Sequence, residues 1–546
     1  MRTVAVLLAA LLAFPSAATA QSALGSAAAP PRLVVAISVD QFSADLFAEY
    51  RALFTHGLKR LQQGAVFPAG YQSHAATETC PGHSTILTGV RPARSGIIAN
   101  HWIDQSIARP EKLVYCAEDE RQSADPGNPL SSAVHLLAPT LGDRLKAADP
   151  RTRNVAVAGK DRAALMMGGK TLDQVYWWKG SGFVTLAGRA LGPSALAENE
   201  ALEAEIAAAA PPLDLPAACA PRDRAVSTGP LILGTGRFAR AAGDAGGFRV
   251  SPSLDAATAT LAERLIAELD LGRGPATDVL AVGLSATDYV GHTTGTGGAE
   301  MCLQMLALDR AIGKLLDSLD RRGLDYLVVL TADHGGLDVA ERLRQQAFPQ
   351  AGRIDPALAT GTLAKAIAQR LKIALPRPVI LADGPAGDIY LDRGLSPRQR
   401  QSVLAELKAL ERHPQVAAVF TAAELTRVPS PTGSPETWSL AQRARASFYP
   451  GRSGDAVLLL QPLIVPLAAA GSGAVATHGS PWDYDRRVPI LFWRRGMAGF
   501  EQPHAVETVD IAPTLAAVLG LAVPAGSFDG RCLDLDAGAG DTCASR

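Results

Sequence analysis

Runs of apolar residues recur along the chain and predict the strands of one buried sheet. Each run is short and rich in Val, Ile, Leu or Ala, which is typical of strands covered on both faces. The predicted strands cover residues 33–39, 154–158, 278–284, 326–331 and 488–493. Apolar positions at helical spacing predict a long helix over 299–320, and a last helix over 511–519 with Asp510 as its N-cap. Strands alternating with helices indicate an α/β fold with a mainly parallel sheet sandwiched by helices.

Two long segments interrupt this pattern and separate groups of candidate site residues. The segment at about 163–275 is rich in Ala, Gly and Pro, and the segment at about 346–474 carries short strand candidates of its own. We interpret both as insertions that cap the site of one catalytic domain spanning residues 21–546. No internal repeat is found along the chain.

Polar residues stand where several predicted strands end. Asp40 ends the first run, Asp288 closes the run at 278–284 with His292 four residues later, and Asp333 and His334 follow the run at 326–331. Ligands bind at the carboxyl ends of strands in an open α/β sheet, so we expect these side chains to converge. Carboxylates gathered there need a cation between them.

The ligand types favour zinc over magnesium or calcium, which prefer mostly oxygen. A loop histidine and a hydroxyl residue complete the candidate set. The candidate metal ligands are Asp40, Thr79, Asp288, His292, Asp333, His334 and His478. Taken alone, each Asp/His pair is weak evidence, and His478 could be an ordinary loop histidine. The other histidines, His83 among them, are interpreted as structural or surface residues.

Thr79 is the candidate nucleophile. The segment from Thr77 to Gly89 predicts a helix with Thr79 at its cap and Pro81 in its first turn. The plain alternative is that Thr79 only caps the helix. A hydroxyl at a helix N-terminus faces free N–H groups that favour a bound phosphate, and a nearby zinc ion would lower its pKa.

Three further residues could grip a phosphoryl group. Lys160 and Arg162 follow the strand at 154–158 and, if the chain stays extended, point the same way. Asn100 could add a hydrogen bond. The alternative is a solvated turn at 160–162 and an ordinary turn asparagine.

Composition and charge exclude several classes of protein. Of the 546 residues, 47% are hydrophobic and 19% charged, which indicates a globular chain. The formal net charge of −1 gives no reason to expect nucleic acid or an anionic membrane as a partner. We expect a monomer without a membrane span.

The N-terminus is typical of a secretory signal. Arg2 precedes an apolar stretch over residues 4–14, and Ala18-Thr19-Ala20 offers a small-residue cleavage site. Residues 1–20 are therefore predicted to be a signal peptide, and the protein to be periplasmic or secreted. Disulfides are permitted there, and Cys532 and Cys543 are predicted to pair because they are close in sequence. The pairing of the other four cysteines is left open.

These motifs together resemble the alkaline phosphatase superfamily. The stretches VVAISVDQF, TETCPGHSTILTG, AGKDRAALMMGG, SATDYVGH, LTADHGG and ATHGS occur in family order. Within the superfamily the chain is similar to single-chain bacterial alkaline phosphatases of the PafA and PhoK type, which use threonine as nucleophile. The resemblance covers nearly the whole chain after the predicted signal and implies an alkaline phosphatase-like core.

The resemblance also implies roles for the candidate residues. It assigns Asp288, His292 and His478 to one zinc ion. It assigns Asp40, Thr79, Asp333 and His334 to a second, and Asn100, Lys160 and Arg162 to the substrate phosphate. The implied reaction is a double displacement through phosphothreonine, with two zinc ions per chain and inorganic phosphate as a product inhibitor.

The implied substrates are phosphate monoesters. Related nucleotide pyrophosphatase/phosphodiesterases lack the lysine–arginine pair, so Lys160 and Arg162 favour monoesters. The alternatives are a phosphodiesterase of the same superfamily and a non-catalytic zinc-binding protein.

Overall fold

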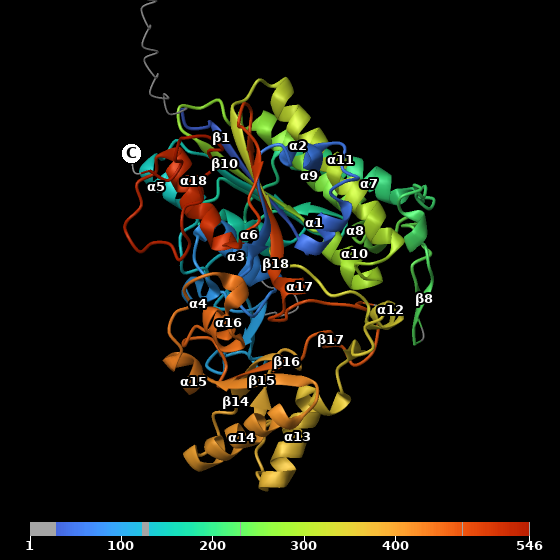
Figure 1. Cartoon of the computed structure of the whole chain (residues 1–546), viewed down its shortest axis with the longest axis vertical. Helices are drawn as coiled ribbons and strands as arrows, with labels where there is room; N and C mark the ends of the chain where they lie inside the picture. Colours follow the sequence, from blue (N-terminus) through green and yellow to red (C-terminus); the bar gives the residue numbers. More distant parts are fainter. Residues whose placement is uncertain (1–28, 123–129, 230, 472, 545–546) are drawn as a thin grey trace, which may run out of the picture.

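The computed structural model describes residues 29–122, 130–229, 231–471 and 473–544, so the predicted signal peptide lies outside it. A central sheet crosses the upper part of the molecule in the strand order β19-β2-β18-β11-β1-β10-β5-β6-β7, with β20 beside β2 (Figure 1). The strands are β1 (Leu33–Val39), β2 (Ala65–Tyr71), β5 (Asn154–Ala158), β6 (Gln174–Lys179), β7 (Gly182–Val184), β10 (Asp278–Leu284), β11 (Tyr326–Thr331), β18 (Arg487–Arg494), β19 (Phe500–Glu501) and β20 (Val506–Glu507).

The middle of the sheet is parallel, as the sequence predicted. β1 lies between β10 and β11 and is parallel to both, and β5 and β6 continue the parallel order beyond β10. β18 is antiparallel to its neighbours β11 and β2. All the strands predicted from apolar runs are present, as β1, β5, β10, β11 and β18. The fold is the expected α/β sandwich.

Helices cover both faces of the sheet because alternate strand residues enter two separate cores. Val35 and Ile37 of β1 pack in one core, whereas Val34 and Ala36 pack in the other. The first core is covered by α1 (Ala44–Tyr50), α2 (Gly57–Leu61), α7 (Pro193–Ala207), α9 (Ser253–Glu268), α10 (Ala286–Thr294) and α11 (Ala299–Arg321). The second is covered by α3 (Thr79–Thr88), α5 (Leu141–Ala148), α6 (Asp161–Gly168) and α18 (Ile511–Leu519).

The segment 346–474 forms most of a second lobe, called the cap lobe below. It holds an antiparallel sheet in the order β13-β14-β16-β15, with its own apolar core (Figure 1, lower end). Its main elements are α13 (Thr360–Leu371), β13 (Ile380–Leu381), β14 (Gly387–Leu391), α14 (Pro397–Ala409), β15 (Val416–Thr421), α15 (Ala422–Arg427), α16 (Leu440–Ser447) and β16 (Ala456–Leu460). The strand candidates of this segment are thus present.

The segment 163–275 does not form a cap, contrary to its interpretation from the sequence. It adds β6 and β7 to the central sheet, and α7 and α9 to one helical layer. Most of it therefore belongs to the core, because its buried leucines and aromatic residues pack against the sheet. Smaller elements complete the description: α4 (Pro92–Ser95), β3 (His101–Ile103), β4 (Leu113–Tyr115), β8 (Val226–Thr228), β9 (Leu231–Leu233), α8 (Ala245–Arg249), α12 (Ala340–Gln345), β12 (Gly352–Arg353), β17 (Ile464–Val465) and α17 (Asp483–Arg486).

All six cysteines are paired. Cys532 and Cys543 form the predicted disulfide, and the remaining pairs are Cys80–Cys116 and Cys219–Cys302. The last two join segments that are far apart in sequence, which is why spacing alone could not predict them. Among the described residues, no helix is long and apolar enough to cross a membrane.

Candidate active site

The site lies at the carboxyl edge of three adjacent parallel strands. Asp40 follows β1, Asp333 follows β11, and Asp288 lies in the first turn of α10 just after β10. The register pairs Val39 with Leu284 and Ser38 with Thr331, so the three strands end side by side. The sheet therefore brings together carboxylates that are up to 293 positions apart in sequence, in accord with the rule for open α/β sheets.

Asp288, His292 and His478 form one group whose ligand atoms lie within 4.8 Å of one another. The Nε2 atoms of His292 and His478 face Asp288 Oδ1 at 3.3 and 3.4 Å. Their Nδ1 atoms contact the backbone carbonyl oxygens of Ala476 and Thr77 at 2.9 and 2.8 Å. This is the usual orientation of metal-binding histidines, because a carbonyl that holds the Nδ1 proton leaves Nε2 free as a ligand.

Asp40, Asp333 and His334 form a second group next to the first. His334 Nε2 lies 3.1 Å from Asp333 Oδ2, and its Nδ1 contacts the carbonyl oxygen of Gly335 at 2.8 Å. The rings of His334 and His478 stack with centroids 3.6 Å apart, which joins the two groups. All three side chains of the second group are fully buried.

Thr79 is buried beside the second group, at the first position of α3. The helix starts one residue earlier than expected, because the extended residue Glu78 takes the N-cap position and Thr79 is already helical. Gly89 ends the helix in the left-handed conformation, at a φ of 69°, as its position in the sequence suggested. The Oγ1 atom of Thr79 has no hydrogen-bond partner among the described residues.

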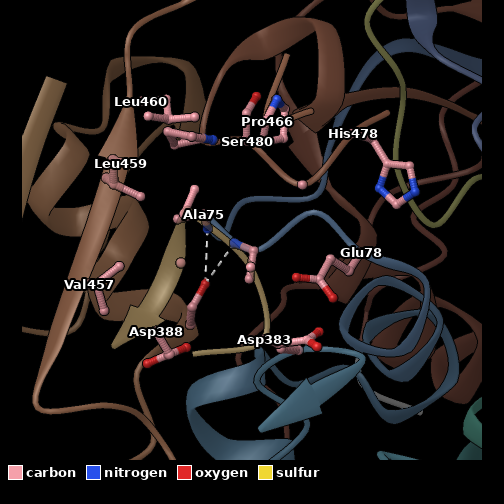
Figure 2. A pocket seen from close by; sticks show the side chains of 18 of the residues that line it. Ala75, Glu78, Asp383, Asp388, Val457, Leu459, Leu460, Pro466, His478 and Ser480 are labelled. Atoms are coloured by element: carbon pink, nitrogen blue, oxygen red, sulfur yellow. Dashed lines mark hydrogen bonds between the residues drawn. The ribbon is translucent and has the colours of Figure 1, made fainter. Parts of the chain in front are cut away.

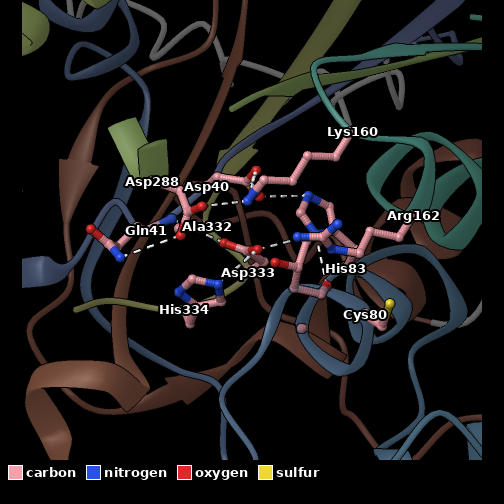
Figure 3. Close-up of polar contacts among 12 residues, drawn as sticks. Asp40, Gln41, Cys80, His83, Lys160, Arg162, Asp288, Ala332, Asp333 and His334 are labelled. Atoms are coloured by element: carbon pink, nitrogen blue, oxygen red, sulfur yellow. Dashed lines mark hydrogen bonds and ion pairs between the residues drawn. The ribbon is translucent and has the colours of Figure 1, made fainter. Parts of the chain in front are cut away.

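Two residues of this site were missed by sequence reasoning. His83 is fully buried, with Nε2 3.4 Å from Asp40 and Nδ1 3.2 Å from Asp333 (Figure 3). It lies one helical turn after Thr79 on the same face, and that spacing was the available signal. Its interpretation as a structural or surface residue overlooked the fact that a helix entering the site brings both positions with it.

Gln41 links the two groups and is the other missed residue. Its backbone N–H donates to Asp333 Oδ1 at 3.1 Å, and its Nε2 donates to Asp288 Oδ1 at 3.3 Å. It adopts a left-handed φ of 63°, which is uncommon for a residue other than glycine and clusters at functional sites. Nothing in the sequence pattern signals this conformation.

The polar atoms of the site fit metal ions. Asp40 Oδ1, Asp333 Oδ2 and His334 Nε2 are buried and have no hydrogen-bond partner among the described residues. Their close neighbours are only other ionisable groups of the site, and buried carboxylates and imidazoles without hydrogen bonds are costly, so a bound cation would satisfy them. The site holds two adjacent clusters of side chains, each with both carboxylate oxygens and imidazole nitrogens, and the Thr79 hydroxyl is next to them. Such mixed ligands suit paired zinc ions better than cations that prefer oxygen.

The electrostatics of the site point the same way. Burial raises the pKa of Asp40 to about 6, and the charge of Asp333 adds to the effect. Burial would also raise the pKa of Asp333, but His334 and His83 outweigh it and hold that pKa well below its usual range. Crowded groups whose pKa values are driven apart are typical of functional sites.

Lys160 lies differently from its expected place beside phosphate. Its Nζ forms ion pairs with Asp288 at 2.5 Å and Asp40 at 2.9 Å, one carboxylate from each group (Figure 3). The chain is not extended after β5, because α6 begins at Asp161 and Lys160 is its N-cap. The expected extended backbone is therefore absent, although Figure 3 shows the Lys160 and Arg162 side chains both extending into the site.

Arg162 and Asn100 face the open side of the site. Both line a cavity of about 470 Å³ together with His292 and His478. Asn100 is held by its Oδ1, which accepts from the backbone N–H of Cys80 at 2.9 Å. Its Nδ2 donates no hydrogen bond to another described residue and is available as a donor. Both residues are therefore candidates for holding a phosphoryl group.

Comparison with known proteins identifies the family. Residues 34–481 match the type I phosphodiesterase/nucleotide pyrophosphatase family. The chain belongs to this family, which is part of the alkaline phosphatase superfamily. Among its relatives, alkaline phosphatase PhoK of Sphingomonas sp. is 57% identical over 526 residues, which cover 95% of this chain and 94% of that protein. Alkaline phosphatase PhoD of Zymomonas mobilis is 51% identical, covering 94% of this chain and 89% of the relative.

Solved structures of the superfamily agree with the fold. The crystal structure of the alkaline phosphatase PafA superposes with a TM-score of 0.80 at 25% identity, covering 93% of this chain and 99% of that chain. The central sheet and the cap lobe therefore belong to an architecture shared within the superfamily.

Proposed function

We propose that the chain is a secreted, zinc-dependent alkaline phosphatase that hydrolyses phosphate monoesters through a phosphothreonine at Thr79. It is a hydrolase of phosphate esters, given relatives named alkaline phosphatase at 57% and 51% identity over most of the chain. The observation that carries the proposal is the buried, unpartnered Thr79 hydroxyl beside two groups of metal-binding side chains. Arg162 and Asn100 line the cavity on the open side of the candidate active site.

The residues that would hold metal are Asp288, His292 and His478 at one position. At the other they are Asp40, His83 and Asp333, with His334 beside Asp333 as a further candidate. Two bound zinc ions would supply Lewis acidity, which lowers the pKa of a hydroxyl and stabilises a leaving oxygen. The buried carboxylates neutralise most of the metal charge. The backbone carbonyls at Ala476 and Thr77 keep both histidine rings in place.

Thr79 acts as the nucleophile in this proposal. Its Oγ forms a bond to phosphorus while the bond from phosphorus to the ester oxygen breaks, and the alcohol leaves. A hydroxide then attacks the phosphothreonine, so that inorganic phosphate departs and Thr79 is restored. The positive end of the α3 dipole, at Thr79, would favour the charge of the phosphoryl oxygens, and Arg162 would neutralise part of it.

Arg162 supports monoesters rather than diesters as substrates. A monoester carries one more negative charge on phosphorus than a diester, so a cationic donor favours it. The contacts of Lys160 are with Asp40 and Asp288, so its contribution lies in holding the metal-binding carboxylates as well as in charge. The family description names phosphodiesterases, which makes diester hydrolysis the second candidate.

The test compares an aryl phosphate monoester and diester with the same leaving group, assayed with and without added zinc. The proposal expects zinc-dependent turnover that strongly favours the monoester. A preference for the diester would favour the second candidate. Turnover by fully active protein without bound zinc would contradict the metal assignment. N-terminal sequencing of protein recovered outside the cytoplasm would test cleavage after Ala20.

A further inference from the structure

The cavity beside Arg162 extends from the candidate active site into the cap lobe. Its volume of about 470 Å³ is large enough for a small organic molecule. Its inner end holds Asn100, Arg162, His292 and His478, and its outer end is lined by β14, β16 and the loops next to them. With the phosphoryl group at the inner end, the alcohol part of a monoester has to occupy the remaining space. The inference below rests on the proposed function.

The outer part of the cavity has two unlike walls. Val457, Leu459 and Leu460 of β16 form an apolar wall. The rest of this lining is acidic: Glu78 and Asp383 lie across the cavity from β16, and Asp388 of β14 lies beside Val457. We call these three residues the acidic wall. Figure 2 shows Glu78 between His478 and Asp383, with the β16 side chains across the cavity. Arg162 is the one arginine or lysine that lines the described cavity, and it stands at the inner end.

The acidic wall is not neutralised by its neighbours. Glu78 accepts from the backbone N–H of Asn100 at 2.7 Å, and Asp388 accepts from the backbone N–H of Gly454 at 2.6 Å. Asp383 lies 3.3 Å from His101. Within the described part of the chain, none of the three forms an ion pair with lysine or arginine. Burial and the charge of Glu78 raise the pKa of Asp388 to about 7, so above pH 8 it is ionised.

We propose that the acidic wall and the β16 wall together form a leaving-group subsite that selects monoesters by charge. It accepts alcohols that carry an ammonium or hydroxyl group and rejects alcohols that carry a second anion. Carboxylates accept hydrogen bonds from hydroxyls and attract ammonium, whereas a carboxylate on the substrate meets like charge in a partly enclosed space. The apolar wall contacts methylene and methyl groups in either case.

Two matched substrate pairs test this subsite. Glycerol 3-phosphate and 3-phosphoglycerate differ in one position, where a hydroxymethyl group replaces a carboxylate. Phosphocholine and 3,3-dimethylbutyl phosphate have the same shape but differ in the positive charge. Above pH 8, kcat/KM should be roughly tenfold higher for glycerol 3-phosphate than for 3-phosphoglycerate, and several-fold higher for phosphocholine than for its neutral isostere.

A second experiment replaces carboxylates of the acidic wall with amides, which removes their charge but keeps the shape of the side chains. In the Asp383→Asn/Asp388→Asn double variant both ratios should move toward one. Asp214→Asn, which removes an exposed carboxylate outside the cavity, should leave both ratios unchanged. If the double variant does not fold, Asp383→Asn alone serves, because that side chain is 49% exposed.

Wild-type ratios near one, or ratios that persist in the double variant, would overturn the subsite. These results are distinct from a failure of the proposed function. If no monoester is hydrolysed, including the aryl phosphate, the proposed phosphatase activity is wrong. If all are hydrolysed without regard to charge, only the acidic wall loses its role.

Discussion

The strand ends of the core and the cap lobe meet at one cavity but contribute to it in different ways. The core lines the cavity with Arg162, His292 and His478. The other core residues of the site, such as Asp40, Thr79 and Asp333, are almost fully buried, and each is held at the end of a strand or the start of a helix. The cap lobe supplies partly exposed residues, such as Asp383 and Asp388, from a short antiparallel sheet and its loops. This difference suggests that the core carries out the chemistry and the cap lobe sorts the alcohols.

The largest effect should come from Thr79. Thr79→Ala removes the hydroxyl proposed to attack phosphorus, so we expect turnover to fall by about 10⁴-fold or more, as for other lost nucleophiles. Thr79→Ser keeps a hydroxyl and should retain measurable activity. On the cap side, Ser447→Ala also removes a hydroxyl that lines the cavity and should change kcat by only a few-fold. Near-wild-type turnover in Thr79→Ala would contradict the assignment of the chemical step to the core.

The next effect concerns the metal. His478→Ala removes one ligand of the first group and leaves Asp288 with a single histidine, so metal affinity should fall by about a hundredfold or more. Metal content after dialysis, measured by elemental analysis, checks this directly. His413, a cap-lobe histidine paired with Asp355, offers the control, and His413→Ala should bind metal as the wild type does. Unchanged zinc content in His478→Ala would remove that residue from the ligand set.

Substitutions of Lys160 and of Arg162 should have different effects on activity. Arg162→Ala should reduce kcat/KM for an aryl monoester by roughly ten- to a hundredfold and for the matched diester by much less. Lys160→Ala should harm both substrates, because Lys160 pairs with the metal-binding carboxylates Asp40 and Asp288. Lys170→Ala, an exposed lysine just after α6, is the control. Equal losses on both esters in Arg162→Ala would remove the ground for preferring monoesters.

The last predicted effect is on the stability of the cap side. The pKa of Asp388 is raised to about 7 by burial and by Glu78, so the folded protein binds this proton more tightly than the unfolded chain. The resulting stabilisation is fully present below about pH 4 and is lost as the pH rises through about 7. Between pH 4 and 7 the wild type should therefore lose about 1.4 kcal/mol more stability per pH unit than Asp388→Asn. Parallel pH profiles from urea unfolding would contradict this.

The core was predictable from sequence because its signals are local. Unbroken apolar runs identify β1, β5, β10, β11 and β18, and a polar residue directly after a strand end marks a ligand. The rule that parallel strands share one carboxyl edge then brings Asp40, Asp288 and Asp333 together without further information. The likeness to a known superfamily added the assignment of roles.

The rest depended on tertiary structure. The left-handed conformation of Gln41 and the ion pairs of Lys160 arise only when distant segments meet. The pairing of Cys80 with Cys116 likewise requires the hairpin of β3 and β4 to lie against α3. The segment 163–275 suggests a cap because it is rich in Ala, Gly and Pro and separates two groups of site residues, yet its strand β6 pairs in parallel with β5 in the central sheet.

The most direct test of the central claim is to trap the phosphoenzyme and locate the phosphoryl group. Wild-type protein is mixed with a labelled aryl phosphate, quenched in acid, digested and sequenced by mass spectrometry. The label should appear on Thr79, within the peptide that also contains Cys80 and His83, and should be absent from Thr79→Ala. A label on another residue of the cavity, or rapid turnover with no covalent label under conditions that trap phosphothreonine, would contradict the assignment of Thr79 as nucleophile.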